Sequence, residues 1–157
     1  MSETRHRWFA VPLLVVLLPL IVVALTIWFV AAISVLLIVW TTWCPRGRYA
    51  LVVYSDSPIW QPYFDAQVLP AVGNRGVMLN WSDRARWKFS LAVVSFRLFG
   101  GHRNFNPMVI VFPPFRWPRR FRFYEAFRAF KHGRPESVER TRTDLLGLLD
   151  QITAPRR

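Results

Sequence analysis

Residues 49–60 read YALVVYSDSPIW, an apolar run that ends in a short polar turn. An apolar run of this length, bounded by turn residues, is typical of a buried strand. Ser57 precedes Pro58, and a serine N-cap followed by proline at the first helical position predicts a helix start. The stretch therefore predicts a strand, a turn at Ser55–Pro58, and a helix that Pro70 ends.

Further runs predict an alternation of strands and helices downstream of this turn. Three more strands are expected, over residues 75–82, 106–112 and 120–124. Two more helices are expected, one over 83–99 with Ser82 as its N-cap, and one over 135–152. The predicted order is β-α-β-α-β-β-α, which describes an α/β domain over 50–152 with a polar tail over 153–157.

The N-terminal part of the chain is a long apolar run. No charged residue occurs from Trp8 to Trp43. The run is longer than the roughly 18 residues that mark a membrane helix, and it lacks the small-residue cleavage site of a signal peptide. The sequence thus predicts a basic flank over 1–7, a transmembrane segment over 8–43 and a linker over 44–49.

The number of membrane spans depends on the length of this run. A single helix over 8–43 would be about 54 Å long, whereas the hydrocarbon core is about 30 Å thick. Basic residues flank both ends of the run, which favours a cytoplasmic location for both ends. We therefore expect a helical hairpin that turns near Trp28. The alternative is one long span, because no Gly, Pro or Asn lies near Trp28 to make a turn.

The charge balance favours the cytoplasmic side for the soluble part. The net charge is +12, and residues 45–157 hold 19 of the 21 Lys and Arg but 8 of the 9 acidic residues. A basic domain beside a membrane segment suits the cytoplasmic face, where anionic lipids lie. The single cysteine, Cys44, excludes an internal disulfide and a multi-cysteine zinc site. We expect no metal and no cofactor.

The predicted order, with Pro107 directly before the third strand in NPMVIVF (106–112), resembles the thioredoxin-like superfamily over about residues 48–151. In that family a cis proline at this position faces the redox turn that follows the first strand. The resemblance therefore implies a groove between Pro107 and the turn formed by Ser55, Asp56, Ser57 and Pro58. Family redox chemistry needs a cysteine thiolate, and this turn has none. The resemblance implies a redox-inactive domain that serves as a binding or scaffold module.

An enzyme of non-thiol chemistry that uses the same groove is the alternative function. A serine nucleophile needs a general base within hydrogen-bond reach. The chain offers His6, His102 and His132, none in a recognisable catalytic pattern. Helix capping by Ser57, with Asp56 favouring the helix dipole, explains the same residue types without chemistry.

The strongest local signal is the basic and aromatic stretch FRWPRRFRFYEAFRAFKHGR, residues 115–134. The alternation of Phe with Arg over 120–123 favours aromatic side chains in the core and arginines outside. Tethering near a bilayer favours anionic lipid over nucleic acid as the partner. A plain solvated face is the alternative. We expect no nucleic acid, a protein partner at the groove, and a lipid-facing patch formed by Arg116, Trp117, Arg119, Arg120, Arg122, Arg128 and Lys131.

Overall fold

The computed structural model describes residues 3–101, 106–132 and 136–154, and side chains from Leu17 onward apart from that of Lys131. The chain divides into two compact units, one that ends at Ser34 and one that begins at Val35. The boundary falls inside the N-terminal helix, so the last turns of that helix belong to the second unit.

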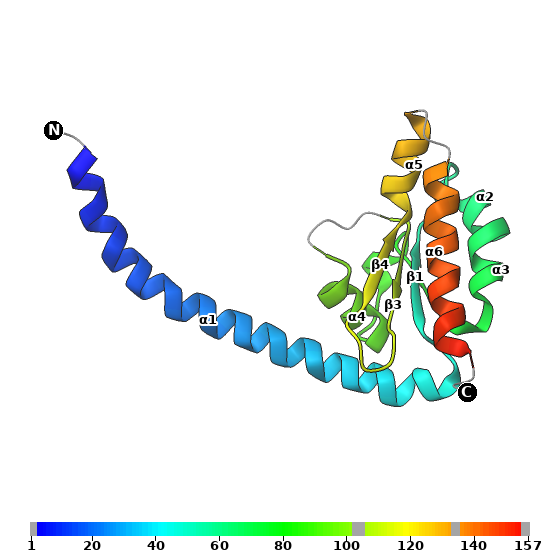
Figure 1. The fold of residues 1–157 in the computed structure, drawn as a ribbon, viewed down its shortest axis with the longest axis horizontal. Coiled ribbons are helices and arrows are strands. Elements are labelled where there is room, and N and C mark those ends of the chain that lie inside the picture. Colours follow the sequence, from blue (N-terminus) through cyan, green and yellow to red (C-terminus); the bar gives the residue numbers. More distant parts are fainter. Residues whose placement is uncertain (1–2, 102–105, 133–135, 155–157) are drawn as a thin grey trace. The chain divides into compact units, whose positions relative to one another are not determined.

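Helix α1 (Glu3–Thr42) is one continuous helix, so the predicted hairpin is wrong (Figure 1). The run holds no Gly, Pro or Asn that would reverse the chain near Trp28, and its hydroxyl side chains are satisfied within the helix. The hydroxyl of Thr26 donates to the carbonyl of Val22 at 2.8 Å, and that of Ser34 donates to the carbonyl of Val30 at 2.9 Å. By length and apolar composition, this helix is able to cross a membrane.

The second unit is an α/β domain built on a mixed sheet of four strands. They are β1 (Ala50–Tyr54), β2 (Gly76–Asn80), β3 (Met108–Val111) and β4 (Arg119–Arg122), in the spatial order β2-β1-β3-β4. Strand β1 pairs parallel with β2 and antiparallel with β3, and β3 pairs antiparallel with β4. The four predicted strands are confirmed, although the fourth begins one residue earlier than expected.

The first predicted helix starts later and ends later than the sequence suggests. It consists of α2 (Gln61–Tyr63), a π-helical turn (Phe64–Val68) and α3 (Leu69–Val72). Pro70 therefore does not end the helix. In the wide turn the N–H of Leu69 bonds the carbonyl of Phe64, five residues back. A π-helical turn relaxes the backbone where proline lacks a donor, so the helix passes through Pro70.

The remaining helices differ from the prediction in two ways. Helix α4 (Leu91–Phe99) is shorter than expected, because Ser90 rather than Ser82 is its N-cap and accepts a bond from the N–H of Val93 at 3.3 Å. Helix α5 (Phe123–Lys131) was not expected, and it follows β4 directly. Helix α6 (Glu136–Thr153) confirms the last predicted helix.

Both faces of the sheet are covered (Figure 1). Helices α2, α3 and α6 lie on one face and α4 on the other. The central strand β1 accordingly buries Ala50 and Val52 in the main core, and its alternate residues Leu51 and Val53 are fully buried as well. A strand buried on both faces explains why YALVVY is apolar throughout rather than alternating.

The last turns of α1 form part of this domain. Leu36 is 1% exposed and Val39 is fully buried, and the ring of Trp43 meets that of Phe112 edge to face, with centroids 5.9 Å apart. The apolar run thus serves two purposes. Its residues up to Ser34 form the separate first unit, while those from Val35 to Trp43 pack as a core element of the second.

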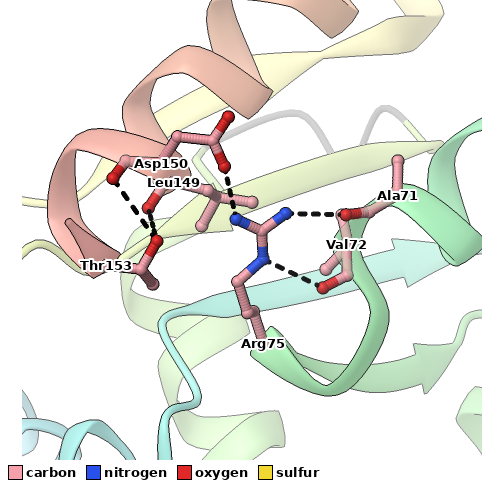
Figure 2. Close-up of polar contacts among 6 residues, drawn as sticks. All are labelled: Ala71, Val72, Arg75, Leu149, Asp150 and Thr153. Atoms are coloured by element: carbon pink, nitrogen blue, oxygen red, sulfur yellow. Dashed lines mark hydrogen bonds and ion pairs between the residues drawn. The ribbon is translucent and has the colours of Figure 1, made fainter.

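Arg75 joins α3 to α6, as Figure 2 shows. Its guanidinium donates to the carbonyls of Ala71 at 2.7 Å and Val72 at 3.3 Å, and to a carboxylate oxygen of Asp150 at 2.7 Å. The two carbonyls belong to the last turn of α3, and that of Val72 also begins the 3-10 turn Gly73–Arg75. Arg75 therefore caps one helix while it holds a second against the sheet.

Candidate functional site

The strand register places the predicted site residues at two opposite ends of the sheet. Val53 pairs with Met108, which pairs with Arg122, and we call this the turn end. Ala50 pairs with Val111, which pairs with Arg119, and we call this the α1 end, because the chain enters β1 there from Trp43 through the linker. The two ends carry different side chains and are described in turn.

At the turn end, a ring of three hydrogen bonds joins the residues that follow the two parallel strands. The N–H of Asp56 donates to Oγ of Ser82 at 3.0 Å, and the N–H of Ser82 donates to Oδ1 of Asn80 at 2.9 Å. Nδ2 of Asn80 closes the ring with a 2.9 Å bond to Oδ1 of Asp56. The polar residues of the turn therefore hold the ends of β1 and β2 together.

This ring replaces the capping roles that the sequence predicted. The backbone carbonyl of Ser57, rather than its hydroxyl, accepts the N–H groups of Trp60 and Gln61, at 3.1 and 2.9 Å. Asp56 bonds across to Asn80 and does not cap a helix. The prediction for Asp56 overlooked a competing partner: the carboxyl ends of neighbouring parallel strands meet, which brings Asp56 to Asn80 and Ser82.

Pro107 lies beside this turn, as the register requires. It follows the cis peptide of Asn106 and directly precedes Met108, the partner of Val53. Its own side chain is buried, and its carbonyl accepts the N–H of Tyr124 at 3.2 Å. The most exposed apolar side chain of the turn is that of Ile59, directly after the exposed Pro58. The turn end therefore combines an exposed apolar side chain, that of Ile59, with a turn held by hydrogen bonds.

The geometry gives little support for chemistry at this turn. Within the described residues, neither the Ser55 nor the Ser57 hydroxyl bonds to a histidine or a carboxylate. His102, the candidate base named from the sequence, lies outside the described residues. Across that same described part of the chain, no three His, Cys, Asp or Glu side chains gather in a way that would hold a metal ion.

The predicted basic patch does not form one surface. Arg116, Trp117 and Arg119 lie at the α1 end, in and after the loop that joins β3 to β4. Strand β4 then runs to the turn end over about 10 Å, and the nine residues of α5 add about 13 Å. Figure 1 shows α5 and the β3–β4 loop at opposite ends of the domain. Arg128 is exposed on α5, and Lys131 is the last residue of that helix.

The arginines between these ends are engaged with neighbouring groups. Nη1 of Arg122 pairs with Glu125 at 2.8 Å, and the guanidinium of Arg119 lies 5.9 Å from the ring centre of Phe121. Gly101, at a φ of 97°, leaves space for Arg120, whose Nη1 would lie 2.7 Å from a Cβ at that position. A shallow cavity of about 710 Å³ runs along β4. Its lining mixes arginines 119, 120 and 122 with Glu125 and Asp144. The positive charge of the arginines on β4 is therefore partly neutralised by these two carboxylates.

At the α1 end, an aromatic cluster surrounds the loop between β3 and β4. Phe99 at the end of α4 contacts both Phe112 and Trp117, each with ring centroids 5.8 Å apart. Trp40 of α1 lies 5.4 Å from Phe115 by the same measure. The aromatic residues of the basic stretch thus divide as well: Phe121 and Phe123 enter the core, whereas Phe115 and Trp117 stay at the surface.

Comparisons of the chain with protein-family models, with curated proteins and with solved structures found no match.

Sequence reasoning missed Asn80 and the surface position of Phe115. Asn80 had a usable signal, because NWS (80–82) directly follows a strand parallel to the one that SDS (55–57) follows. Phe115 had a weaker signal, since three prolines at 113, 114 and 118 mark a loop rather than a strand around it.

Proposed function

We propose that this chain is a membrane-anchored, redox-inactive thioredoxin-like domain. It acts as a binding or scaffold module at the cytoplasmic surface of a membrane. A partner binds at the turn end, in the groove between Ser55–Pro58 and Pro107, and anionic lipid binds at the α1 end. The observation that carries the binding role is the exposed side chain of Ile59 at the turn end. The Asp56–Asn80–Ser82 ring uses the polar groups of the turn to hold the strand ends together.

The thioredoxin-like assignment draws support from topology and from one proline. A parallel β1–β2 pair, an antiparallel β3 and the order β2-β1-β3-β4 agree with the resemblance noted in the sequence. The cis Asn106–Pro107 peptide directly before β3 agrees with it too. The turn that would carry redox cysteines in that family holds serine, aspartate and serine, so thiol exchange has no nucleophile there.

The length of the part of α1 that lies outside the domain supports a membrane anchor. Residues 35–43 pack within the domain, so the apolar run available to the bilayer covers residues 8–34, about 40 Å of helix. That length spans a hydrocarbon core about 30 Å thick and leaves about 10 Å for the headgroup regions on the two sides. The domain after the helix holds 19 of the 21 Lys and Arg, and such a basic domain suits the cytoplasmic face, where anionic lipids lie.

The position of the turn end supports partner binding. It lies across the sheet from the point where the chain leaves α1, so a partner reaches it without competing with the bilayer. Exposed Ile59 at its tip supplies the apolar contact that partner surfaces commonly contain.

A photo-reactive amino acid in place of Ile59 tests this function in intact membranes. The matched control places the same group at Gln151, which is exposed near the end of α6. We expect discrete crosslinked products from position 59 and none of the same size from position 151. Equal patterns from both positions, or no product at 59, would contradict a binding role for the turn end.

A further inference from the structure

The loop of residues 113–118 holds a large aromatic side chain out in solvent. Phe115 is 82% exposed and has a φ of 58°, the one positive value among the described residues other than glycine. A positive φ is unfavourable for a bulky residue and persists only where its surroundings fix it. Pro113, Pro114 and Pro118 limit the backbone on both sides. The loop is therefore built to present Phe115 outward.

The same loop presents two other side chains that suit a membrane interface. Trp117 is 48% exposed while its ring rests on Phe99. Arg116 is exposed between the two aromatic residues. Trp at the headgroup level and arginine on lipid phosphate are the side chains that membrane interfaces favour. The alternating order Phe-Arg-Trp supplies both kinds of contact within three residues.

Chain continuity holds this loop close to the membrane segment. The Phe115 ring contacts Trp40, which is six residues after Ser34, or about 9 Å along the helix. The loop therefore stays within one or two helical turns of the last residue available to the bilayer. A surface held this close meets lipid at a high effective concentration.

We propose that the 113–118 loop is a lipid-inserting element. Phe115 and Trp117 enter the interfacial layer of the bilayer beside the end of α1, and Arg116 binds lipid phosphate. This inference rests on the proposed membrane anchor and deepens it, because it assigns lipid contact to one loop rather than to the whole predicted basic patch. Arg128 and Lys131, on α5, do not take part.

Site-specific fluorescence in vesicles tests the proposal with the full-length chain. In a Cys44→Ser background, single cysteines replace Phe115, Phe89 and Leu25, and each carries an environment-sensitive dye. Phe89 is the matched control. It is also a phenylalanine, 93% exposed, but it lies two residues after Trp87, whose indole N–H donates to the carbonyl of Asn80 at the turn end. Leu25 reports the anchor itself.

The vesicles contain equal amounts of phosphatidylcholine and phosphatidylserine, and quenching is measured with nitroxide-labelled lipid and with aqueous iodide. We expect lipid quenching with loss of iodide quenching at positions 115 and 25, and the reverse at 89. Near-ultraviolet circular dichroism confirms that each labelled variant keeps the fold of the Cys44→Ser protein.

Three results would overturn the inference, and they separate it from the anchor. Lipid quenching at 25 with iodide quenching at 115 would leave the anchor intact and remove the inserting loop. Protection of 115 from both quenchers would mean that protein, such as a second copy of the chain, covers the loop. Absence of lipid quenching at 25 would remove the anchor and the loop proposal together.

Discussion

The two ends of the sheet are built from the same four strands but are completed by different chemistry. At the α1 end, the ring of Phe112 contacts Trp43, which follows α1, and Phe99 of α4. Phe99 in turn contacts Trp117 of the β3–β4 loop. At the turn end, a ring of hydrogen bonds among Asp56, Asn80 and Ser82 joins the two parallel strands. The α1 end buries the last turns of an apolar helix, whereas the turn end leaves Pro58 and Ile59 exposed to solvent.

Under the proposed function, the difference separates anchoring from partner binding within one small domain. Apolar packing is non-directional and tolerates contact with lipid, whereas a hydrogen-bonded turn keeps its geometry in water. The following predictions test this contrast, first at the α1 end and then at the turn end.

The largest effect is expected at the end of α1. Leu36→Ala removes a side chain that is 1% exposed, so we expect the free energy of unfolding to fall by about 2–4 kcal/mol. Leu37, its exposed neighbour, is the control, and Leu37→Ala should cost less than about 0.5 kcal/mol. Denaturant unfolding of the full chain in detergent, followed by near-ultraviolet circular dichroism, measures both. Equal losses would show that these turns are not part of the domain core.

A smaller loss is expected at Arg75, which also lies at the α1 end because Gly76 pairs with Ala50. Arg75→Met removes the guanidinium bonds to the carbonyls of Ala71 and Val72 and should cost about 1–2 kcal/mol of unfolding free energy. Asp150→Asn removes only an exposed ion pair, and should cost less than about 0.5 kcal/mol. Thermal unfolding of the two variants distinguishes helix capping from charge pairing. A larger loss in Asp150→Asn would contradict the capping role.

At the turn end, Asn80→Ala breaks two of the three bonds of the ring. We expect a loss of about 1 kcal/mol, because the bonds are accessible to water and their net value is modest. Ser55→Ala changes a hydroxyl outside the ring and should leave the free energy of unfolding within about 0.5 kcal/mol of wild type. If the two substitutions were equivalent, the ring would not hold the strand ends.

The smallest effect concerns Tyr63 on α2. Burial, followed by the nearby charge of Glu139 and the 3.1 Å bond to its carboxylate, raises the pKa of Tyr63 to about 12. The folded state therefore holds this proton more tightly than the unfolded chain does. Its contribution to stability is complete below pH 10.0, the ordinary pKa of tyrosine, and is lost as the pH rises toward 12.

The comparison for this prediction is Tyr63→Phe. The variant should lose less stability than wild type between those two pH values, and the difference should be small because the phenol is partly exposed. A phenolate absorbance titration should show the highest-pKa phenol missing from the variant. Identical titration curves for the two proteins would contradict the shifted pKa.

Much of the architecture was predictable from the sequence, because its strands are short apolar runs bounded by turn residues. YALVVY and NPMVIVF read as buried strands, and both are strands. The apolar run from Trp8 to Trp43 read as helical, and α1 covers all of it except Trp43. These signals are local, so tertiary structure did not override them.

The errors arose where a local signal had a competing partner. Ser82 is a good N-cap in isolation, but its hydroxyl accepts the N–H of Asp56 beside the parallel strands. Ser90 caps α4 instead. Pro70 is a helix breaker unless a wide turn precedes it. The hairpin was inferred from the length of the apolar run and from the basic residues at both of its ends. The run available to the bilayer is shorter than it seemed, because residues 35–43 belong to the domain. The groove at Pro107 followed from the resemblance, and its partner stays a prediction.

The most direct test of the account places one reporter at the N-terminus and another at the C-terminus and determines the side of the membrane that each occupies. A single spanning α1 predicts opposite sides, with the C-terminal domain in the cytoplasm. Both reporters on the cytoplasmic side would mean that the apolar run crosses twice or not at all. A C-terminal reporter on the far side would contradict the cytoplasmic scaffold.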